Sequence, residues 1–135
     1  MLKYFVIKYL RKLGKKNIIN GQNFVGLLND RISIDTLVRG GHEKEIKRLL
    51  VKNFLSKKRN VALDIGAHIG SYTGMLSLYF NKVYAFEPNK TSFELLKINT
   101  RKNNNVKIFN LFLSNKNSKI KLETNVANIP SNIAL

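Results

Sequence analysis

Two acids and two glycines in the middle of the chain have the residue types and the spacing of a nucleotide-binding site. Asp64 ends a short apolar run, Gly66 and Gly70 follow it, and Glu87 ends a second apolar run. An acid at the tip of the first strand can accept from loop N–H groups or a ligand ammonium, and an acid about 20 residues on can accept both hydroxyls of a ribose. Glycine lets a ligand approach the backbone because it carries no Cβ atom. These residues therefore predict a nucleotide or nucleoside site.

The loop between the two acids favours a ligand without a pyrophosphate. The dinucleotide fingerprint is Gly-x-Gly-x-x-Gly, whereas this loop reads Asp64-x-Gly66-x-x-x-Gly70, with His68 in place of the glycine that admits the pyrophosphate. S-adenosylmethionine is a smaller ligand that fits this loop better than NAD or FAD. A P-loop is not expected, because the chain has no Gly-x-x-x-x-Gly-Lys-Ser/Thr run. The expected cofactor contacts are Asp64, Ile65, Gly66, Ala67, His68, Gly70 and Glu87, with Ala67, His68 and Ile69 contributing mainly backbone N–H groups.

Alternating strands and helices would place these residues at one edge of a parallel sheet. The apolar runs at 61–65 and 83–86 predict strands, and 71–80 has the spacing of a crossover helix between them. Gly74 interrupts that helix, where we expect it to permit close packing against the sheet. Thr91 and Glu94 form a candidate capping box for a helix that runs to about Lys102 and in which Asn99 is expected to make structural hydrogen bonds. Residues 106–113 alternate like a strand that is covered on both faces.

The segments on either side have weaker patterns. Residues 42–57 have a 3.6-residue apolar period and predict a helix, whereas 31–38 fits a short strand or a helix equally well. Residues 14–30 predict irregular structure, and 119–123 predicts an added strand. Residues 1–16 have an apolar helical stripe, which favours a helix packed on the domain or a partner; a helix lying on an anionic membrane surface is the alternative. The expected domains are a basic helical and irregular segment, 1–58, and a sheet domain, 59–135.

The sequence around the two acids resembles the FkbM-type methyltransferases, which are class I enzymes that use S-adenosylmethionine. The resemblance rests on 64–70, Asp-Ile-Gly-Ala-His-Ile-Gly, on 85–89, Ala-Phe-Glu-Pro-Asn, and on Asn99. Gly41-His42-Glu43 is similar to the Gly-aromatic-Glu element of the family and Leu113-Ser114-Asn115 to its Leu-Ser-Asp turn, so the similarity runs from about Asp35 to Glu123. His68 replaces the usual Asn, and the Lys-apolar-Asp-x-Glu-Gly run of a later family strand has no counterpart in the chain.

The resemblance implies a fold, a cofactor and an activity. The fold is α/β, the Rossmann-like three-layer sheet of a class I methyltransferase, here partial and without the C-terminal half, with a basic helical N-terminal segment. The cofactor is S-adenosyl-L-methionine, and Glu43 helps to line its pocket by resemblance alone. The activity is O-methylation of a small-molecule hydroxyl, such as that of a sugar. No residue is identified as a catalytic base.

The charge balance of the chain is strongly basic. Its 135 residues include 24 Lys and Arg against 8 Asp and Glu, which gives a formal net charge of +16. The basic residues run through every segment and do not cluster, so nucleic acid is not the expected partner. The chain has no cysteine, and His42 and His68 lack ligand spacing, so no metal site is expected.

Three functions are compatible with these features. The first is methyl transfer to a small-molecule acceptor, the second is a truncated fragment that binds S-adenosylmethionine without catalysis, and the third is a basic module that binds nucleic acid or a membrane surface. Within 1–16 the longest uncharged run is Tyr4–Ile7, too short for a signal segment or a membrane span, so we expect a cytoplasmic protein, with peripheral membrane contact through 1–16 as the alternative. Three or four strands leave a sheet edge and an apolar face uncovered, from which we expect a homodimer or a marginally stable chain.

Overall fold

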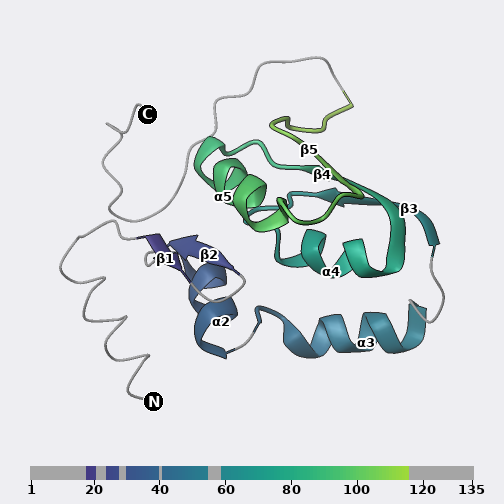
Figure 1. Ribbon diagram of the computed structural model, residues 1–135, viewed down its shortest axis with the longest axis horizontal. Helices are drawn as coiled ribbons and strands as arrows, with labels where there is room; N and C mark the ends of the chain where they lie inside the picture. Colours follow the sequence, from purple (N-terminus) through teal and green to yellow (C-terminus); the bar gives the residue numbers. More distant parts are fainter. Residues whose placement is uncertain (1–17, 21–23, 28–29, 40, 55–58, 116–135) are drawn as a thin grey trace.

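A three-stranded parallel sheet forms the centre of the computed structural model, which describes residues 18–20, 24–27, 30–39, 41–54 and 59–115 (Figure 1). The strands are β3 (Arg59–Ile65), β4 (Phe80–Phe86) and β5 (Val106–Phe109), in the spatial order β3-β4-β5. Helix α4 (Ser71–Tyr79) joins β3 to β4, and helix α5 (Lys90–Thr100) joins β4 to β5. Parallel strands joined in sequence by helices form a Rossmann-like α/β unit, so the expected fold class is confirmed.

Helices α4 and α5 lie on the same face of the sheet (Figure 1). Side chains alternate between the two faces of a strand, and those on the covered face are small or branched. Val83 and Ala85 of β4 are completely buried. The central cluster consists of Ala67, Ala85 and Leu96, with Phe93 and Ile108 packed against it. Small side chains let both helices approach the sheet closely, which fixes the loops at the ends of β3 and β4.

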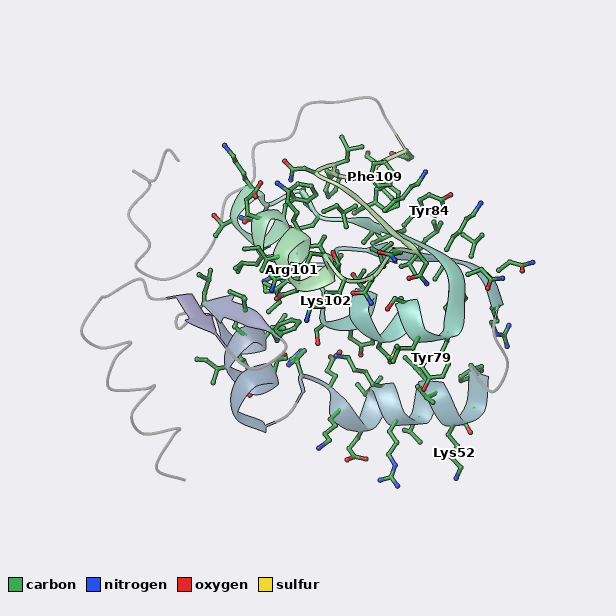
Figure 2. All side chains as sticks on the ribbon, viewed as in Figure 1. Lys52, Tyr79, Tyr84, Arg101, Lys102 and Phe109 are labelled. Atoms are coloured by element: carbon green, nitrogen blue, oxygen red, sulfur yellow. The ribbon has the colours of Figure 1, made fainter. Side chains whose placement is uncertain are left out.

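The opposite face of the sheet is mostly apolar, although the register also places Lys82 and Lys107 on it, and it has no described helix over it. Three branched side chains of β3 are at least half exposed there, namely Val61 at 50%, Leu63 at 61% and Ile65 at 64%. Beside them the ring of Phe109 stacks on that of Phe86, with centroids 5.0 Å apart, and on that of Tyr84, with centroids 6.3 Å apart. Figure 2 labels Tyr84 and Phe109 on this side of the molecule. The described part of the chain therefore leaves one complete sheet face in contact with water.

Strand β5 is shorter and more exposed than the alternating pattern of 106–113 predicts. It ends at Phe109, and 111–113 are exposed and outside the strand. The prediction of a strand covered on both faces is therefore wrong for the described residues. The side chain of Asn110 explains where the strand stops, because it turns back and donates to the carbonyl oxygen of Glu87 at 2.7 Å.

A short hairpin and a helix precede the sheet unit. Strand β1 (Ile18–Asn20) pairs antiparallel with β2 (Val25–Leu27), and α2 (Arg31–Arg39) follows. The prediction of irregular structure for 14–30 is wrong where the hairpin forms. For 31–38 the sequence allowed a short strand or a helix, and the structure has a helix. Asp30 caps that helix, since its carboxylate accepts the N–H of Ser33 at 2.6 Å.

Helix α3 (Lys44–Phe54) confirms the helix predicted for 42–57 and lies beside α4 (Figure 1). The start of α5 differs from the prediction, because Asn89 and not Thr91 is the N-cap residue. The side chain of Asn89 accepts the N–H of Ser92 at 3.0 Å, while Glu94 pairs with Lys97 at 2.9 Å. Asparagine caps helices at least as well as threonine, and its position directly after Glu87-Pro88 starts the helix sooner.

Several expectations fall on other parts of the chain. The amphipathic helix predicted at 1–16 and the strand predicted at 119–123 lie outside the described residues. The division of the chain into 1–58 and 59–135 stays a prediction. None of the helices in the described ranges combines the length and the apolar character needed to cross a bilayer.

Candidate functional site

The loop after β3 folds back onto the end of β4. The N–H groups of Gly66 and Ala67 both donate to the carbonyl oxygen of Phe86, at 2.9 and 3.0 Å. Gly66 has a φ of 80° and His68 a φ of 52°, left-handed values that glycine adopts without strain and that cost histidine conformational energy. A Cβ atom added to Gly66 would meet nothing within 4 Å. The backbone of the loop is therefore open above Gly66, where a ligand could approach it.

Helix α5 holds the loop from behind through Asn99. Its amide nitrogen donates to the carbonyl oxygens of Ile69 at 2.8 Å and Val25 at 2.9 Å, and its Oδ1 accepts the N–H of Val25 at 2.7 Å. Gly70 packs against the same helix, because a Cβ atom there would lie 2.8 Å from Cδ1 of Leu96. The structural role expected of Asn99 is confirmed, and one side chain connects α5, the glycine loop and β2.

Glu87 follows directly after β4, and its carboxylate binds the glycine loop and the start of α5. It is 6% exposed. Its Oε2 accepts the N–H of His68 at 2.7 Å, and its Oε1 accepts the N–H of Asn89 at 2.8 Å. Its own N–H donates to the carbonyl oxygen of Phe109 at 3.0 Å. A carboxylate has about four lone-pair sites, so these two hydrogen bonds do not use the whole acceptor capacity of Glu87.

Two of the N–H groups expected to face a ligand are donated inside the protein. That of Ala67 binds Phe86, and that of His68 binds the carboxylate of Glu87. Ala67 itself belongs to the core at 5% exposed, whereas Ile65 is 64% exposed. The surface that the loop offers is therefore made by Ile65 and Gly66 more than by the residues after them.

Asp64 lies near the end of β3 and contacts α4. Its Oδ2 accepts the hydroxyl of Thr73 at 2.6 Å, and the backbone N–H of Thr73 adds a second hydrogen bond. Burial raises the pKa of the Asp64 carboxyl, against the opposing effects of Thr73 and of the Lys47 ammonium. The negative charge is thus incompletely compensated by the protein, which suits a carboxylate that accepts a cationic ligand group.

Glu43 and Lys47 bring α3 to the first turn of α4. The Oε2 atom of Glu43 accepts the Tyr72 hydroxyl at 2.7 Å. The Lys47 ammonium lies 4.5 Å from the centroid of the Tyr72 ring and donates to the carbonyl oxygen of Ser71 at 3.2 Å, and also to its hydroxyl. Burial lowers the pKa of Lys47, although Glu43 and Asp64 oppose this. Burial raises the pKa of Tyr72 to about 12, and its hydrogen bond to Glu43 adds to the shift.

Comparisons with known proteins give partial structural matches. No protein-family model matches the chain, and no curated protein sequence does. Among solved structures, a precorrin 8w decarboxylase of Methanobacterium thermoautotrophicum matches 52% of the chain at 24% identity with a TM-score of 0.45. The 23S rRNA methyltransferase ErmE matches 51% at 22% identity with a TM-score of 0.42, and methyltransferase FkbM of Methylobacillus flagellatus KT matches 44% at 20% identity with a TM-score of 0.35.

The chain spans well under half the length of each of these proteins. The matched parts are 39%, 28% and 18% of the three solved chains, in the order given. Two of the three are methyltransferases by name, and none of these likenesses assigns a function to this chain.

The structure brings residues to the site that the sequence analysis did not select. His68 Nε2 lies 3.6 Å from Oδ1 of Asp30, while its Nδ1 is buried without a hydrogen-bond partner in the described ranges. An Asp directly before a helical stretch is a capping signal that could have marked Asp30. No pattern in the sequence predicts the contact of Asp30 with the loop. The same is true of the contacts of Thr73 with Asp64 and of Tyr72 with Glu43. Over the residues that the structure describes, no three His, Cys, Asp or Glu side chains gather as a metal site.

Proposed function

We propose that this chain binds S-adenosyl-L-methionine at the carboxyl ends of β3 and β4 and transfers a methyl group to a small-molecule hydroxyl, such as that of a sugar. The observation that supports this most is the closure of the glycine loop onto Glu87. In open parallel sheets, ligands bind outside the carboxyl ends of the strands, with an acid of the second strand on the ribose. Here the carboxylate of Glu87 accepts the N–H of His68, two residues after the open backbone of Gly66.

The residues present fit the nucleoside and amino-acid parts of the cofactor. Glu87 would accept the ribose hydroxyls, and Gly66 leaves space for close approach. Asp64 would accept the ammonium group of the cofactor. That positive charge would stabilise the Asp64 carboxylate, which burial destabilises. Glu43 would line the pocket from the start of α3.

S-adenosylmethionine supplies a methyl group that is already activated on a sulfonium. The chain's own residues therefore have to bind both reactants, align them and exclude water. A base that takes the hydroxyl proton would assist the transfer. Tyr72 is unsuited to that role, because its pKa of about 12 keeps the phenol protonated near neutral pH. We assign no base.

Calorimetric titration with S-adenosylhomocysteine tests the binding site. We expect micromolar binding to the wild-type chain and at least about tenfold weaker binding to Glu87→Ala, the loss of a charge-assisted contact. Glu94→Ala is the matched control, because Glu94 is an acid of α5 whose carboxylate pairs with Lys97. Its affinity should equal that of the wild type. Absence of binding to a folded wild-type chain, or equal binding by Glu87→Ala, would contradict the proposed site.

Methyl transfer requires its own measurement. The chain is incubated with S-adenosylmethionine labelled in the methyl group and with a panel of free sugars and nucleotide sugars. Label that appears in a sugar, and that disappears with Glu87→Ala, supports the enzyme. Tight cofactor binding with no transfer to any hydroxyl would refute the catalytic part and favour the non-catalytic binding fragment.

A further inference from the structure

Gly74, in the middle of α4, has no packing reason to be glycine. A Cβ atom added there would meet nothing within 4 Å, so the predicted close packing against the sheet is wrong. Glycine inside a helix is destabilising compared with alanine, so its presence at an open position calls for another use. The free side of Gly74 faces a pocket of about 360 Å³.

This pocket lies among the helices and away from the sheet. Residues of α2, α3 and α4 and the end of α5 line it, and among the described residues none of β3, β4 or β5 does. Phe24 and Met75 form apolar parts of its wall. The pocket is near the lower end of the volume range of small-molecule sites, which is about 300–1,000 Å³.

The charges that line the pocket are all positive. Lys44 and Lys47 of α3 contribute to its wall, and no acidic residue is among the described lining residues. Burial lowers the pKa of Lys47, so its ammonium is poorly solvated in this position. Glu43 and Asp64, whose charges act on Lys47, are not among the lining residues; Glu43 accepts the hydroxyl of Tyr72 and Asp64 that of Thr73.

One residue of the pocket wall also has a hydroxyl that lacks a partner among the described residues. Thr36 of α2 lines the pocket, and its Oγ1 is buried with no hydrogen-bond partner within the described ranges. A buried hydroxyl that lacks a partner is destabilising, and a turn of the Thr36 side chain toward an oxygen acceptor in the pocket would remove that cost. Two lysines and one threonine, from two helices, therefore line one space.

We propose that this pocket binds a compact oxyanion, the phosphate or carboxylate group of a small molecule, between Lys44 and Lys47, with the Thr36 hydroxyl as a further donor. The apolar wall at Phe24 and Met75 takes the carbon part of the ligand. Gly66, His68 and Glu87 do not line the pocket, whereas Gly70, at the end of the glycine loop, does, so the pocket adjoins the proposed cofactor site without including its open glycine or its acid. Anion binding here does not depend on cofactor binding there.

Amide NMR spectra of the ¹⁵N-labelled chain test the site with two probes, inorganic phosphate and acetate, at constant ionic strength. We expect saturable shifts that centre on Gly70, Ser71 and Gly74, which line the pocket. Saturation by phosphate alone assigns a phosphate ligand, and saturation by acetate with equal or higher affinity assigns a carboxylate. If neither probe gives saturable shifts at millimolar concentration, the proposal is overturned.

Three variants separate the pocket from the general positive charge of the chain. Lys44→Gln should weaken the binding of the probe about tenfold, as the loss of a charge-assisted contact does. Lys52→Gln is the matched control, because Lys52 is on the same helix and extends away from the rest of the molecule (Figure 2), and it should leave the affinity unchanged. Gly74→Leu should abolish binding by filling the pocket.

Three results would count against the separate site. Equal effects of Lys44→Gln and Lys52→Gln would show that the anion is bound by the general positive charge of the chain. Unchanged binding in a folded Gly74→Leu chain would place the anion elsewhere. Displacement of the probe by S-adenosylhomocysteine would make the pocket part of the cofactor site. Where the chain binds S-adenosylhomocysteine at all, the proposal requires that both ligands bind simultaneously.

Discussion

Asn99 holds three backbone groups with one amide, and two substitutions at this position distinguish hydrogen bonding from side-chain size. The amide binds both backbone groups of Val25 and the carbonyl oxygen of Ile69, over distances from 2.7 to 2.9 Å. Asn99→Ala removes all three hydrogen bonds. At about 1 kcal/mol for each bond, the free energy of unfolding should fall by about 3 kcal/mol. This is a large part of the 5–15 kcal/mol that stabilises a typical domain.

Asn99→Asp keeps the shape of the side chain but reverses two of its three contacts. One carboxylate oxygen can still accept the N–H of Val25. The other replaces an NH₂ group that donates to two carbonyl oxygens, at 2.8 and 2.9 Å, so lone pairs would face lone pairs. We therefore expect the isosteric variant to lose at least as much stability as the alanine variant, about 3 kcal/mol or more. Both should bind S-adenosylhomocysteine more weakly, because Ile69 belongs to the glycine loop.

Urea unfolding followed by far-UV circular dichroism measures these losses, since the chain contains no tryptophan. Asn104→Asp is the control, because Asn104 is exposed on the turn after α5 and undergoes the same chemical change. Its stability should stay within about 0.5 kcal/mol of the wild type. If Asn99→Asp is as stable as the wild type, or much more stable than Asn99→Ala, the amide donors do not stabilise the fold and the reasoning fails.

Three further predictions concern the loop, the buried acid and the open sheet face. Gly70→Ala should lower the free energy of unfolding by about 1–2 kcal/mol in the same urea assay, because φ is 90° and the new Cβ atom would lie 2.8 Å from Leu96; an unchanged midpoint would contradict this. The raised pKa of Asp64 means that the folded state binds its proton more tightly than the unfolded state. Stability should therefore fall as the pH rises from the ordinary aspartate range through that raised pKa, and urea midpoints across this range should show a smaller fall for Asp64→Asn. The apolar sheet face should make the chain self-associate, as measured by sedimentation velocity, and Leu63→Thr should weaken this association. The control is Leu78→Thr, which changes an equally apolar side chain of α4 that is 70% exposed. It should associate like the wild type.

The sheet unit could be predicted from the sequence because its signals are local. The apolar runs at 61–65 and 83–86 and the helical spacing at 71–80 each lie within one element, and they correspond to β3, β4 and α4. The start of α5 was misplaced because Asn89 and Thr91 are both good capping residues. The hairpin of β1 and β2 was missed because strands of three residues are too short to show alternation.

The candidate site could be predicted only one residue at a time. Gly66 and Glu87 were selected from their spacing, but the bond that joins the loop to the acid is made by a backbone N–H, which every residue but proline has. The contact of Glu43 with Tyr72 joins two helices that are separate in sequence. The close packing predicted for Gly74 is wrong, because the sequence does not distinguish a glycine that borders a pocket from one that permits close packing.

The strand order β3-β4-β5 also has a consequence for how this unit folds. Each strand pairs with the strand that follows it in the chain, and one short helix separates the two. The loops that close during folding are therefore short, and their entropic cost grows only slowly with length. Contacts of low sequence separation favour rapid folding, and chains fold from the N-terminal side during synthesis. This part of the molecule can thus assemble in the direction of translation, with each new helix and strand added to an edge that is already formed.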